Sequence, residues 1–233
     1  MENNLEKKLE DAPVEKKATW ITLRFILALA LFMVTLFLFV AIADEIVIKN
    51  KAGFDNDISE YIHSLVSPEF TRIMQGITFF GSAVFLFPAY IALILFYILA
   101  KKSWLALDIA MIGLSSTGIL FLFKDLFRRN RPLDPLINNV TGFSFPSGHS
   151  FSSFTFFGLL IYIVWMSEIK KIWKIISAIF LFALAAIIAF SRVYLRVHFP
   201  SDVIAGFCLS VVWLMISLWI LHQADRGLSS SKK

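Results

Sequence analysis

Charged residues are scarce in this chain: Asp, Glu, Lys and Arg together make up 17% of its 233 residues. Soluble domains carry roughly 25%, so an ordinary water-soluble enzyme is not expected. Cysteine is nearly missing, because Cys208 is the only one and it stands within an apolar run. This excludes a scaffold built on disulfide bonds. The chain also lacks the low hydrophobicity that intrinsic disorder requires.

Apolar residues are abundant instead: 58% of the chain is hydrophobic, with 25 Phe and 6 Trp, and the mean hydropathy is +0.75. A bilayer core about 30 Å thick needs about 20 apolar residues in a helix. Six stretches fit, so the sequence predicts an all-α fold, a bundle of six transmembrane helices. The expected spans are residues 20–43, 82–100, 105–123, 147–166, 172–190 and 203–221.

The segment between the first two spans predicts one more, shorter helix. Apolar residues recur at helical spacing from Ile58 to Val66, behind Asp57 as an N-cap with Glu60 three residues later. We interpret this as an amphipathic helix on the membrane surface that Pro68 ends. The first span is too long for a signal-peptide core. We therefore expect one membrane domain over residues 20–222, with polar tails at 1–19 and 223–233.

The positions of Lys and Arg predict the orientation, since short cytoplasmic loops are enriched in them. With the N-terminus in the cytoplasm, 12 of the 22 Lys and Arg residues lie inside and nine outside. Six of these nine fall in residues 124–131 and 192–196. Lys and Arg residues that gather on the outer side, against this enrichment, favour a local function such as binding an anion. Snorkelling of Lys and Arg side chains at helix ends would give the same pattern. We expect a cell (inner) membrane protein with both termini cytoplasmic and a site on the outer side.

Three polar segments stand beside the apolar spans. They are Lys124 to Pro132, Pro146 to His149, and Ser191-Arg192 followed by His198 and Asp202. Spans three and five run outward into the first and third segments, and spans four and six run inward from the second and third. The predicted topology therefore places all three segments on one side of the membrane, where they can converge.

The residue types in these segments fit the binding of a tetrahedral anion. Lys124, Arg131 and Arg192 would form a cationic cradle, because charge-assisted hydrogen bonds hold phosphate oxygens strongly. Ser147 and the N–H groups of residues 147–149 belong to a predicted helix N-terminus, which favours an anion. No acidic cluster that could hold a divalent metal accompanies them. We therefore expect no metal and no other cofactor.

Two histidines and a carboxylate supply groups for phosphoryl transfer. His198 and Asp202 are four residues apart across Pro200, which favours the first turn of a helix. Asp202 could accept a hydrogen bond from one ring nitrogen and leave the other to attack phosphorus. His149 would donate a proton to the leaving oxygen. The pattern favours a two-step, metal-independent reaction through a phosphohistidine.

The three segments resemble the signature motifs of the type-2 phosphatidic acid phosphatase superfamily, Lys-x6-Arg-Pro, Pro-Ser-Gly-His and Ser-Arg-x5-His-x3-Asp. Every motif position matches between residues 124 and 202. Six spans fit the lipid phosphatase branch better than the soluble vanadium haloperoxidases. The resemblance implies that His198 is the nucleophile, Asp202 its orienting partner and His149 the general acid. The phosphoryl-binding residues that it implies are Lys124, Arg131, Ser147, Gly148 and Arg192.

Three further cations, Arg128, Arg129 and Arg196, fall outside the motifs. We interpret them as contacts to anionic lipid or to the charges of a substrate headgroup.

The expected enzyme hydrolyses a phosphomonoester or pyrophosphate headgroup of a lipid. Undecaprenyl pyrophosphate and phosphatidylglycerophosphate are the leading substrates, and phosphatidic acid and lipid A phosphates are alternatives. A lipid-to-lipid phosphotransferase would use the same first half-reaction. An anion transporter is a more distant alternative, because the cations gather at one face. The expected partners are the lipid substrate and the bilayer, and not nucleic acid.

Overall fold

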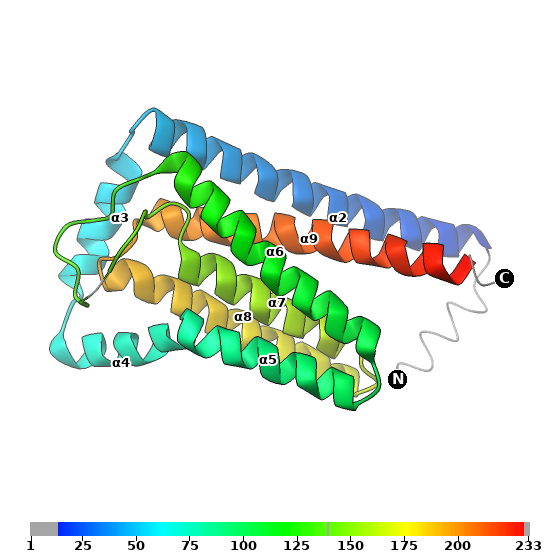
Figure 1. Ribbon diagram of the computed structural model, residues 1–233. Coiled ribbons are helices and arrows are strands. Elements are labelled where there is room, and N and C mark those ends of the chain that lie inside the picture. The colour runs from blue at the N-terminus through cyan, green and yellow to red at the C-terminus, as the bar shows by residue number, and fades with distance from the viewer. Residues whose placement is uncertain (1–13, 139, 231–233) are drawn as a thin grey trace.

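The computed structural model describes residues 14–138 and 140–230, and the regular elements in these ranges are helices. Long helices run side by side, and two short ones gather at one end of the bundle (Figure 1). The short helices are α3 (Gly53–Ser64) and α4 (Pro68–Phe79). The long helices are α2 (Val14–Ile42), α5 (Ala83–Leu99), α6 (Ser103–Phe127), α7 (Gly148–Met166), α8 (Lys171–Tyr194) and α9 (Pro200–Ser230). A π-helical segment, η1 (Ala43–Ile48), continues α2.

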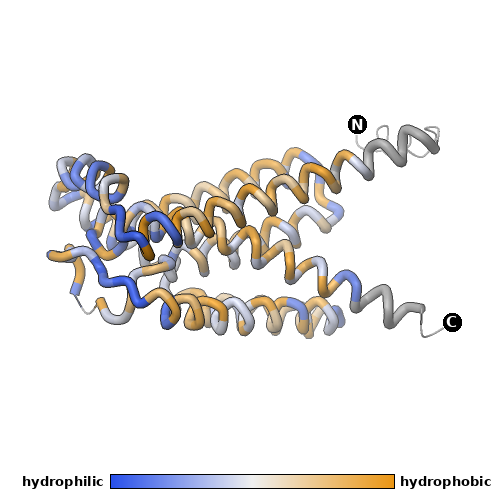
Figure 2. The backbone as a smooth tube through the Cα atoms, turned by 90° about the horizontal axis from the view of Figure 1, so that it is seen from above, coloured by the Kyte–Doolittle hydropathy of each residue, from blue (hydrophilic) through white to orange (hydrophobic). Residues whose placement is uncertain are grey.

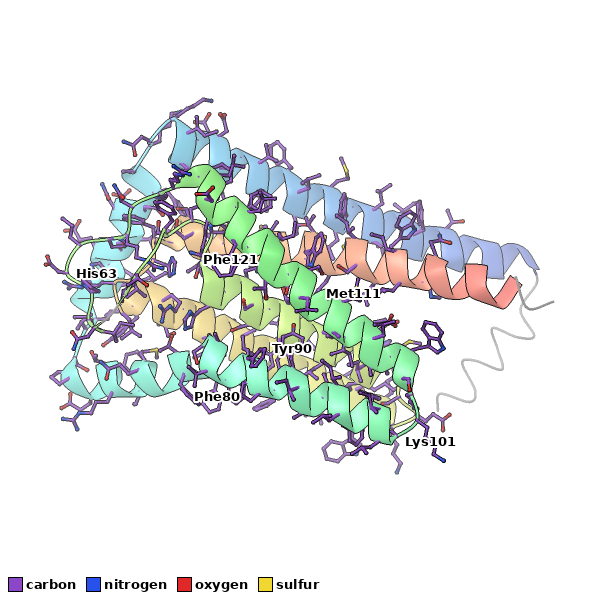
Figure 3. The ribbon with its side chains drawn as sticks, in the orientation of Figure 1. His63, Phe80, Tyr90, Lys101, Met111 and Phe121 are labelled. Atoms are coloured by element: carbon purple, nitrogen blue, oxygen red, sulfur yellow. The ribbon has the colours of Figure 1, made fainter. Side chains whose placement is uncertain are left out.

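Six helical stretches of the described residues are long and apolar enough to cross a membrane. Apolar residues line the shafts, whereas hydrophilic residues gather at the end that carries α3 and the long loops (Figure 2). Large apolar side chains project from the shafts, and the labelled His63 and Lys101 lie at opposite ends (Figure 3). Because Phe37 is 70% exposed in the isolated chain, such a surface needs lipid as its solvent. The chain is a multi-pass membrane protein, and the predicted six-helix bundle is confirmed.

Several predicted helix boundaries agree closely with the structure. Ser147 is the N-cap of α7 and Ser82 is the N-cap of α5, and each side chain accepts a hydrogen bond from the N–H three residues later. Helix α8 runs to Tyr194, four residues beyond the expected span. Hydropathy misses this last turn because it carries polar residues that the protein itself buries. The predicted tails fall partly outside the described residues, at 1–13 and 231–233.

The prediction for the surface helix was right about its existence and wrong about its start. Helix α3 begins at Gly53, so Asp57 lies inside the helix and is not its N-cap. The position before Gly53 is Ala52, which offers no side-chain cap.

Helix α4 was not predicted at all. Pro68, interpreted as a terminator, instead opens α4 with Ser67 as its N-cap. Proline is tolerated there because the first turn of a helix has no acceptor for that N–H.

The centre of the bundle is α7, which packs most extensively against α8 and α9. A side chain at Gly206 of α9 would place its Cβ only 2.9 Å from the carbonyl oxygen of Ser147. Glycine is therefore required where the two helices start. The Ser150 hydroxyl of α7 also donates to the carbonyl of Val203 of α9 at 2.7 Å. These contacts bring the N-termini of α7 and α9 together.

Candidate active site

The three polar segments converge at one end of the bundle, as their predicted topology requires. Helices α6 and α8 end where α7 and α9 begin (Figure 1). Lys124 lies in the last turn of α6 and Arg192 in the last turn of α8. His149 and Asp202 lie in the first turns of α7 and α9. Each side chain is thus carried by the end of a different packed helix.

His198 stands in the loop between α8 and α9, is 2% exposed, and has a different partner at each ring nitrogen. Its Nδ1 lies 3.4 Å from Oδ2 of Asp202, and its Nε2 lies 3.0 Å from Nη1 of Arg131. A guanidinium group has donors only, so Nε2 must accept and Nδ1 carries the proton. The Nε2 lone pair therefore points toward the cations of the site.

The protonation of His198 follows from its surroundings. Burial, together with the nearby charges of Arg131, Arg192 and Lys124, lowers the pKa of His198 well below its ordinary value. The imidazole is therefore neutral at pH 7. A neutral ring keeps the lone pair that a nucleophile needs.

Lys124 and Arg131 of the cationic cradle are held by backbone carbonyls. Nζ of Lys124 donates to the carbonyl oxygen of Phe143 at 2.6 Å. Arg131 donates through Nε to Gly142 at 2.9 Å, through Nη2 to Thr141 at 3.0 Å and through Nη1 to Val197 at 2.8 Å. The loop before α7, together with Val197 in the loop before α9, thus fixes both cations through neutral acceptors.

Arg192, the third member of the cationic cradle, is 5% exposed and forms no ion pair with a carboxylate of the described residues. Its Nη1 donates to the hydroxyl of Thr78 at 2.6 Å. Its Nε is buried and has no hydrogen-bond partner within the described part of the chain. Buried donors are almost always satisfied in proteins, and a phosphate oxygen would satisfy this one.

Thr78 was missed in the sequence because α4 was missed. The signal was the run Ser67-Pro68-Glu69, which has the N-cap and the N1 proline of a helix start.

The N-terminus of α7 faces the cationic cradle. A Cβ at Gly148 would lie 3.3 Å from Cδ2 of Leu120 and 3.7 Å from Cε of Lys124. The Ser147 N–H donates to the carbonyl oxygen of Asp202 at 3.0 Å, which ties the Pro-Ser-Gly-His segment to α9. The lack of a side chain at Gly148 lets Lys124 approach the backbone N–H groups of this helix start, where an anion is favoured.

The interpretation of Arg129 as a contact to lipid or headgroup was wrong. Its side chain is only 14% exposed and forms ion pairs with Asp55 at 2.6 Å and Asp202 at 2.7 Å. Its neighbour Arg128 is exposed and pairs with Asp125 at 2.8 Å. Sequence alone cannot separate two adjacent arginines, one buried and one exposed.

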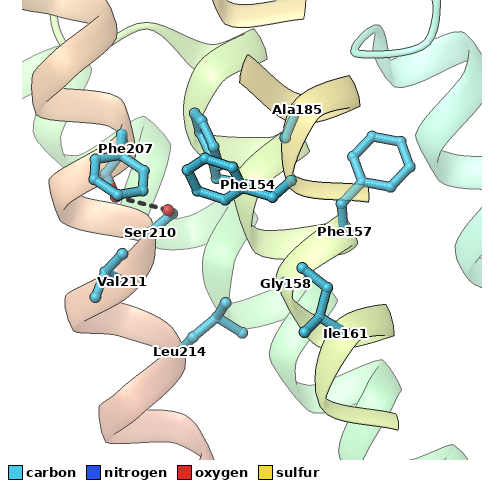
Figure 4. A pocket seen from close by; sticks show the side chains of 10 residues that line it. Phe154, Phe157, Gly158, Ile161, Ala185, Phe207, Ser210, Val211 and Leu214 are labelled. Carbon is cyan, nitrogen blue, oxygen red and sulfur yellow. Dashed lines mark hydrogen bonds between the residues drawn. The ribbon is translucent and has the colours of Figure 1, made fainter. Parts of the chain in front are cut away.

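A cavity of about 110 Å³ lies deeper in the bundle, between α7, α8 and α9 (Figure 4). Its lining is apolar apart from Ser210, whose hydroxyl donates to the carbonyl of Phe207 in its own helix. None of the predicted site residues lines this cavity. It is separate from the polar site at the helix ends.

The PAP2 superfamily model matches residues 103–226, more than half of the chain. The chain belongs to the PAP2 superfamily. This region includes all three motifs, so the predicted family is confirmed, together with its class of enzyme, a hydrolase of phosphoric esters.

Individual relatives agree with this. Phosphatidylglycerophosphatase B of Bacillus subtilis is 30% identical over 186 residues, which is 77% of this chain and 89% of that protein. Dolichyldiphosphatase 1 of Dictyostelium discoideum is 31% identical over 152 residues, 61% of this chain and 66% of that protein. The crystal structure of a transmembrane PAP2-type phosphatidylglycerolphosphate phosphatase from Bacillus subtilis aligns with a TM-score of 0.68 at 28% identity, covering 88% of this chain and 97% of that one.

Proposed function

We propose that this PAP2 protein removes phosphate from the headgroup of a membrane lipid by nucleophilic attack of His198 on phosphorus. One observation carries the proposal. Nδ1 of His198 faces a buried carboxylate, while its Nε2 faces Arg131 in the cationic cradle. A neutral nucleophile thus points at the place where the positive charges would hold a phosphoryl group.

The first half-reaction forms a phosphohistidine. The cationic cradle and the N-terminus of α7, with Ser147 and Gly148, bind the phosphoryl oxygens. Nε2 of His198 then bonds to phosphorus, and the bond from phosphorus to the lipid oxygen breaks. His149 donates a proton to that leaving oxygen. The positive charge that develops on the His198 ring is stabilised by Asp202.

The second half-reaction releases phosphate and restores the enzyme. His149 has lost its proton and accepts one from a water molecule as the water oxygen attacks phosphorus. The bond from phosphorus to Nε2 breaks, and inorganic phosphate leaves. The cationic cradle supplies the charge neutralisation in both steps, so we propose a reaction that is independent of metal ions.

We propose phosphatidylglycerophosphate, or a lipid with the same phosphomonoester headgroup, as the substrate. The matches to the Bacillus subtilis relatives support this, because they extend over 89% and 97% of those chains. A polyprenyl diphosphate is the second candidate, supported by the similarity to dolichyldiphosphatase 1 over 66% of its length. Both substrates present the same terminal phosphoryl group to His198.

The test is phosphate release by the purified protein in detergent, with EDTA and with no acceptor lipid. The lipids are phosphatidylglycerophosphate, undecaprenyl pyrophosphate, phosphatidic acid and a lipid A phosphate, with His198→Ala as the negative control. We expect release with EDTA present, fastest from phosphatidylglycerophosphate. Release only after adding a second lipid would indicate a phosphotransferase, and release abolished by EDTA would contradict the metal-independent reaction.

We also propose that both termini lie in the cytoplasm and the active site on the outer face of the cell membrane. Cys208 is the only cysteine and is buried, so labelling of an introduced cysteine has little background. Leu133→Cys lies in the loop near the site, where Leu133 is 85% exposed, and Lys102→Cys lies at the opposite end, also exposed. A membrane-impermeant maleimide should label only Leu133→Cys in intact cells. Labelling of Lys102→Cys alone would indicate the opposite orientation in the membrane.

A further inference from the structure

Asp202 is held from both of its carboxylate oxygens and is 0% exposed. Its Oδ2 accepts from the N–H of Phe199 at 3.0 Å and lies 3.4 Å from Nδ1 of His198. Its Oδ1 accepts from Nη1 of Arg129 at 2.7 Å. The orientation of the carboxylate toward His198 therefore depends on what holds Arg129.

Arg129 is shared between two buried carboxylates. While Nη1 binds Asp202, its Nη2 donates to Oδ2 of Asp55 at 2.6 Å, and Nη1 also donates to the hydroxyl of Ser201 at 2.8 Å. Its Cζ lies 4.2 Å above the centre of the Phe199 ring. The planar guanidinium can satisfy both acids at once because its donors point in fixed, divergent directions.

Asp55 connects this arrangement to α3. It is 0% exposed, and it accepts from the N–H of Ser201 at 2.9 Å and from the hydroxyl of Ser201 at 2.6 Å. Ser201 immediately precedes Asp202 at the start of α9, where a helix favours an acidic partner. A buried carboxylate such as Asp55 is tolerated only when it is paired and hydrogen-bonded. Its partners here are Arg129 and the start of α9.

We propose that Asp55 and Arg129 are positioning residues of the reaction, an inference that rests on the proposed function. Asp55 holds Arg129, Arg129 holds Asp202, and Asp202 holds the nucleophile His198. Alternating charges run along this chain of four side chains to the ring that becomes positive when Nε2 attacks. The amphipathic helix α3 is then a part of the catalytic machinery, because it supplies the far end of the chain.

This arrangement predicts which kinetic constant changes. Arg129 donates to Asp55, Ser201 and Asp202. Within the described part of the chain it forms no hydrogen bond with the phosphoryl-binding residues Lys124, Arg131 or Arg192. Losing it removes the hydrogen bond to Oδ1 of Asp202 and leaves the carboxylate with fewer hydrogen bonds to hold it toward His198. The loss should therefore fall on kcat, with KM nearly unchanged.

The experiment compares Arg129→Gln with Arg128→Gln in purified protein, using the best lipid substrate of the wild type. The neighbouring Arg128 is a matched control, because it is exposed and its ion pair is with an exposed carboxylate, Asp125. We expect kcat to fall about 10- to 100-fold in Arg129→Gln, the size of loss found when a residue that orients a metal ligand is replaced, and to stay within about 2-fold in Arg128→Gln. In Asp55→Asn, kcat should also fall. Asp57→Asn is the control for this variant, because Asp57 is exposed.

A double variant separates positioning from a general structural role. If Arg129 acts through Asp202, adding Arg129→Gln to Asp202→Asn should lower kcat by no more than about 3-fold further, because the two losses share one cause. Independent losses that multiply would overturn the inference, as would wild-type kcat in Arg129→Gln. If that variant does not fold, Arg129→Lys takes its place in both comparisons. No phosphate release by the wild type from any lipid would instead overturn the proposed function.

Discussion

Nη1 of Arg131 lies 3.0 Å from Nε2 of His198, the atom that we propose as the nucleophile. The same guanidinium is anchored by the carbonyls of Thr141, Gly142 and Val197. Arg131 therefore has two functions in the proposed reaction. It directs the lone pair of His198 into the site, and it donates to the phosphoryl group that meets this lone pair.

Replacing Arg131 tests this double function. Arg131→Gln should lower kcat/KM by about 10²- to 10³-fold, the usual cost of losing one donor that stabilises transition-state charge. Arg131→Lys keeps the charge but not the planar fork, so it should recover only part of the loss. Steady-state phosphate release measures both. Near-normal kcat/KM in Arg131→Gln would show that Arg131 does not contribute to the reaction.

The nucleophile and its orienting partner give a second prediction. His198→Ala should abolish turnover, because it removes the nitrogen that we propose to bond to phosphorus. Asp202→Asn should lower kcat by about 10⁴-fold, as neutralising the carboxylate beside a catalytic histidine does elsewhere. Trapping of radioactive phosphate on the protein distinguishes the two variants, because only a variant that keeps the nucleophile can form the phosphoenzyme. Phosphoenzyme formation in His198→Ala would contradict the assignment of the nucleophile.

The pH dependence follows from the neutral state of His198. Burial and the surrounding cations lower the pKa of this ring well below about 6.5, its ordinary value. A lowered pKa means that the ring stays deprotonated, and hence nucleophilic, as the pH falls through 6.5. The acid limb of kcat/KM for the free enzyme should therefore lie below pH 6.5. An acid limb centred above 6.5 would show that His198 is protonated more easily than its surroundings imply.

Gly81, in the turn between α4 and α5, gives a prediction from packing alone. A Cβ there would clash with Cγ2 of Ile188 and would lie 2.8 Å from Oγ of Ser153 and 3.2 Å from Cδ2 of His149. Gly81→Ala should destabilise the fold by about 1–3 kcal/mol, a typical cost of overpacking, and lower kcat by displacing His149. Gly76→Ala is the control, because its added Cβ would meet nothing within 4 Å beyond the neighbouring backbone of its own helix. Melting temperature and kcat that match between the two variants would contradict this close approach.

Much of this protein could be predicted from local sequence. The spans are visible because a helix exposed to lipid must be apolar along its whole length, and this property is independent of tertiary contacts. The motif segments could be assigned to one side because the number of spans between them fixes their relative side. Ser147 and Pro200 mark the starts of α7 and α9 through capping and backbone preferences that act within a few residues.

Which polar residues are buried together could be learned only from the packing of the helices. Asp55 and Arg129 are 74 residues apart and each looks like an ordinary surface charge in the sequence, yet α3 packs on the start of α9 and encloses both. Thr78 reaches Arg192 only because α4 packs against α8. The spans and the chemistry of the motifs follow from the amino-acid sequence, since these depend on local hydropathy and residue type. The support around Asp202 depends on long-range packing, which no local pattern records.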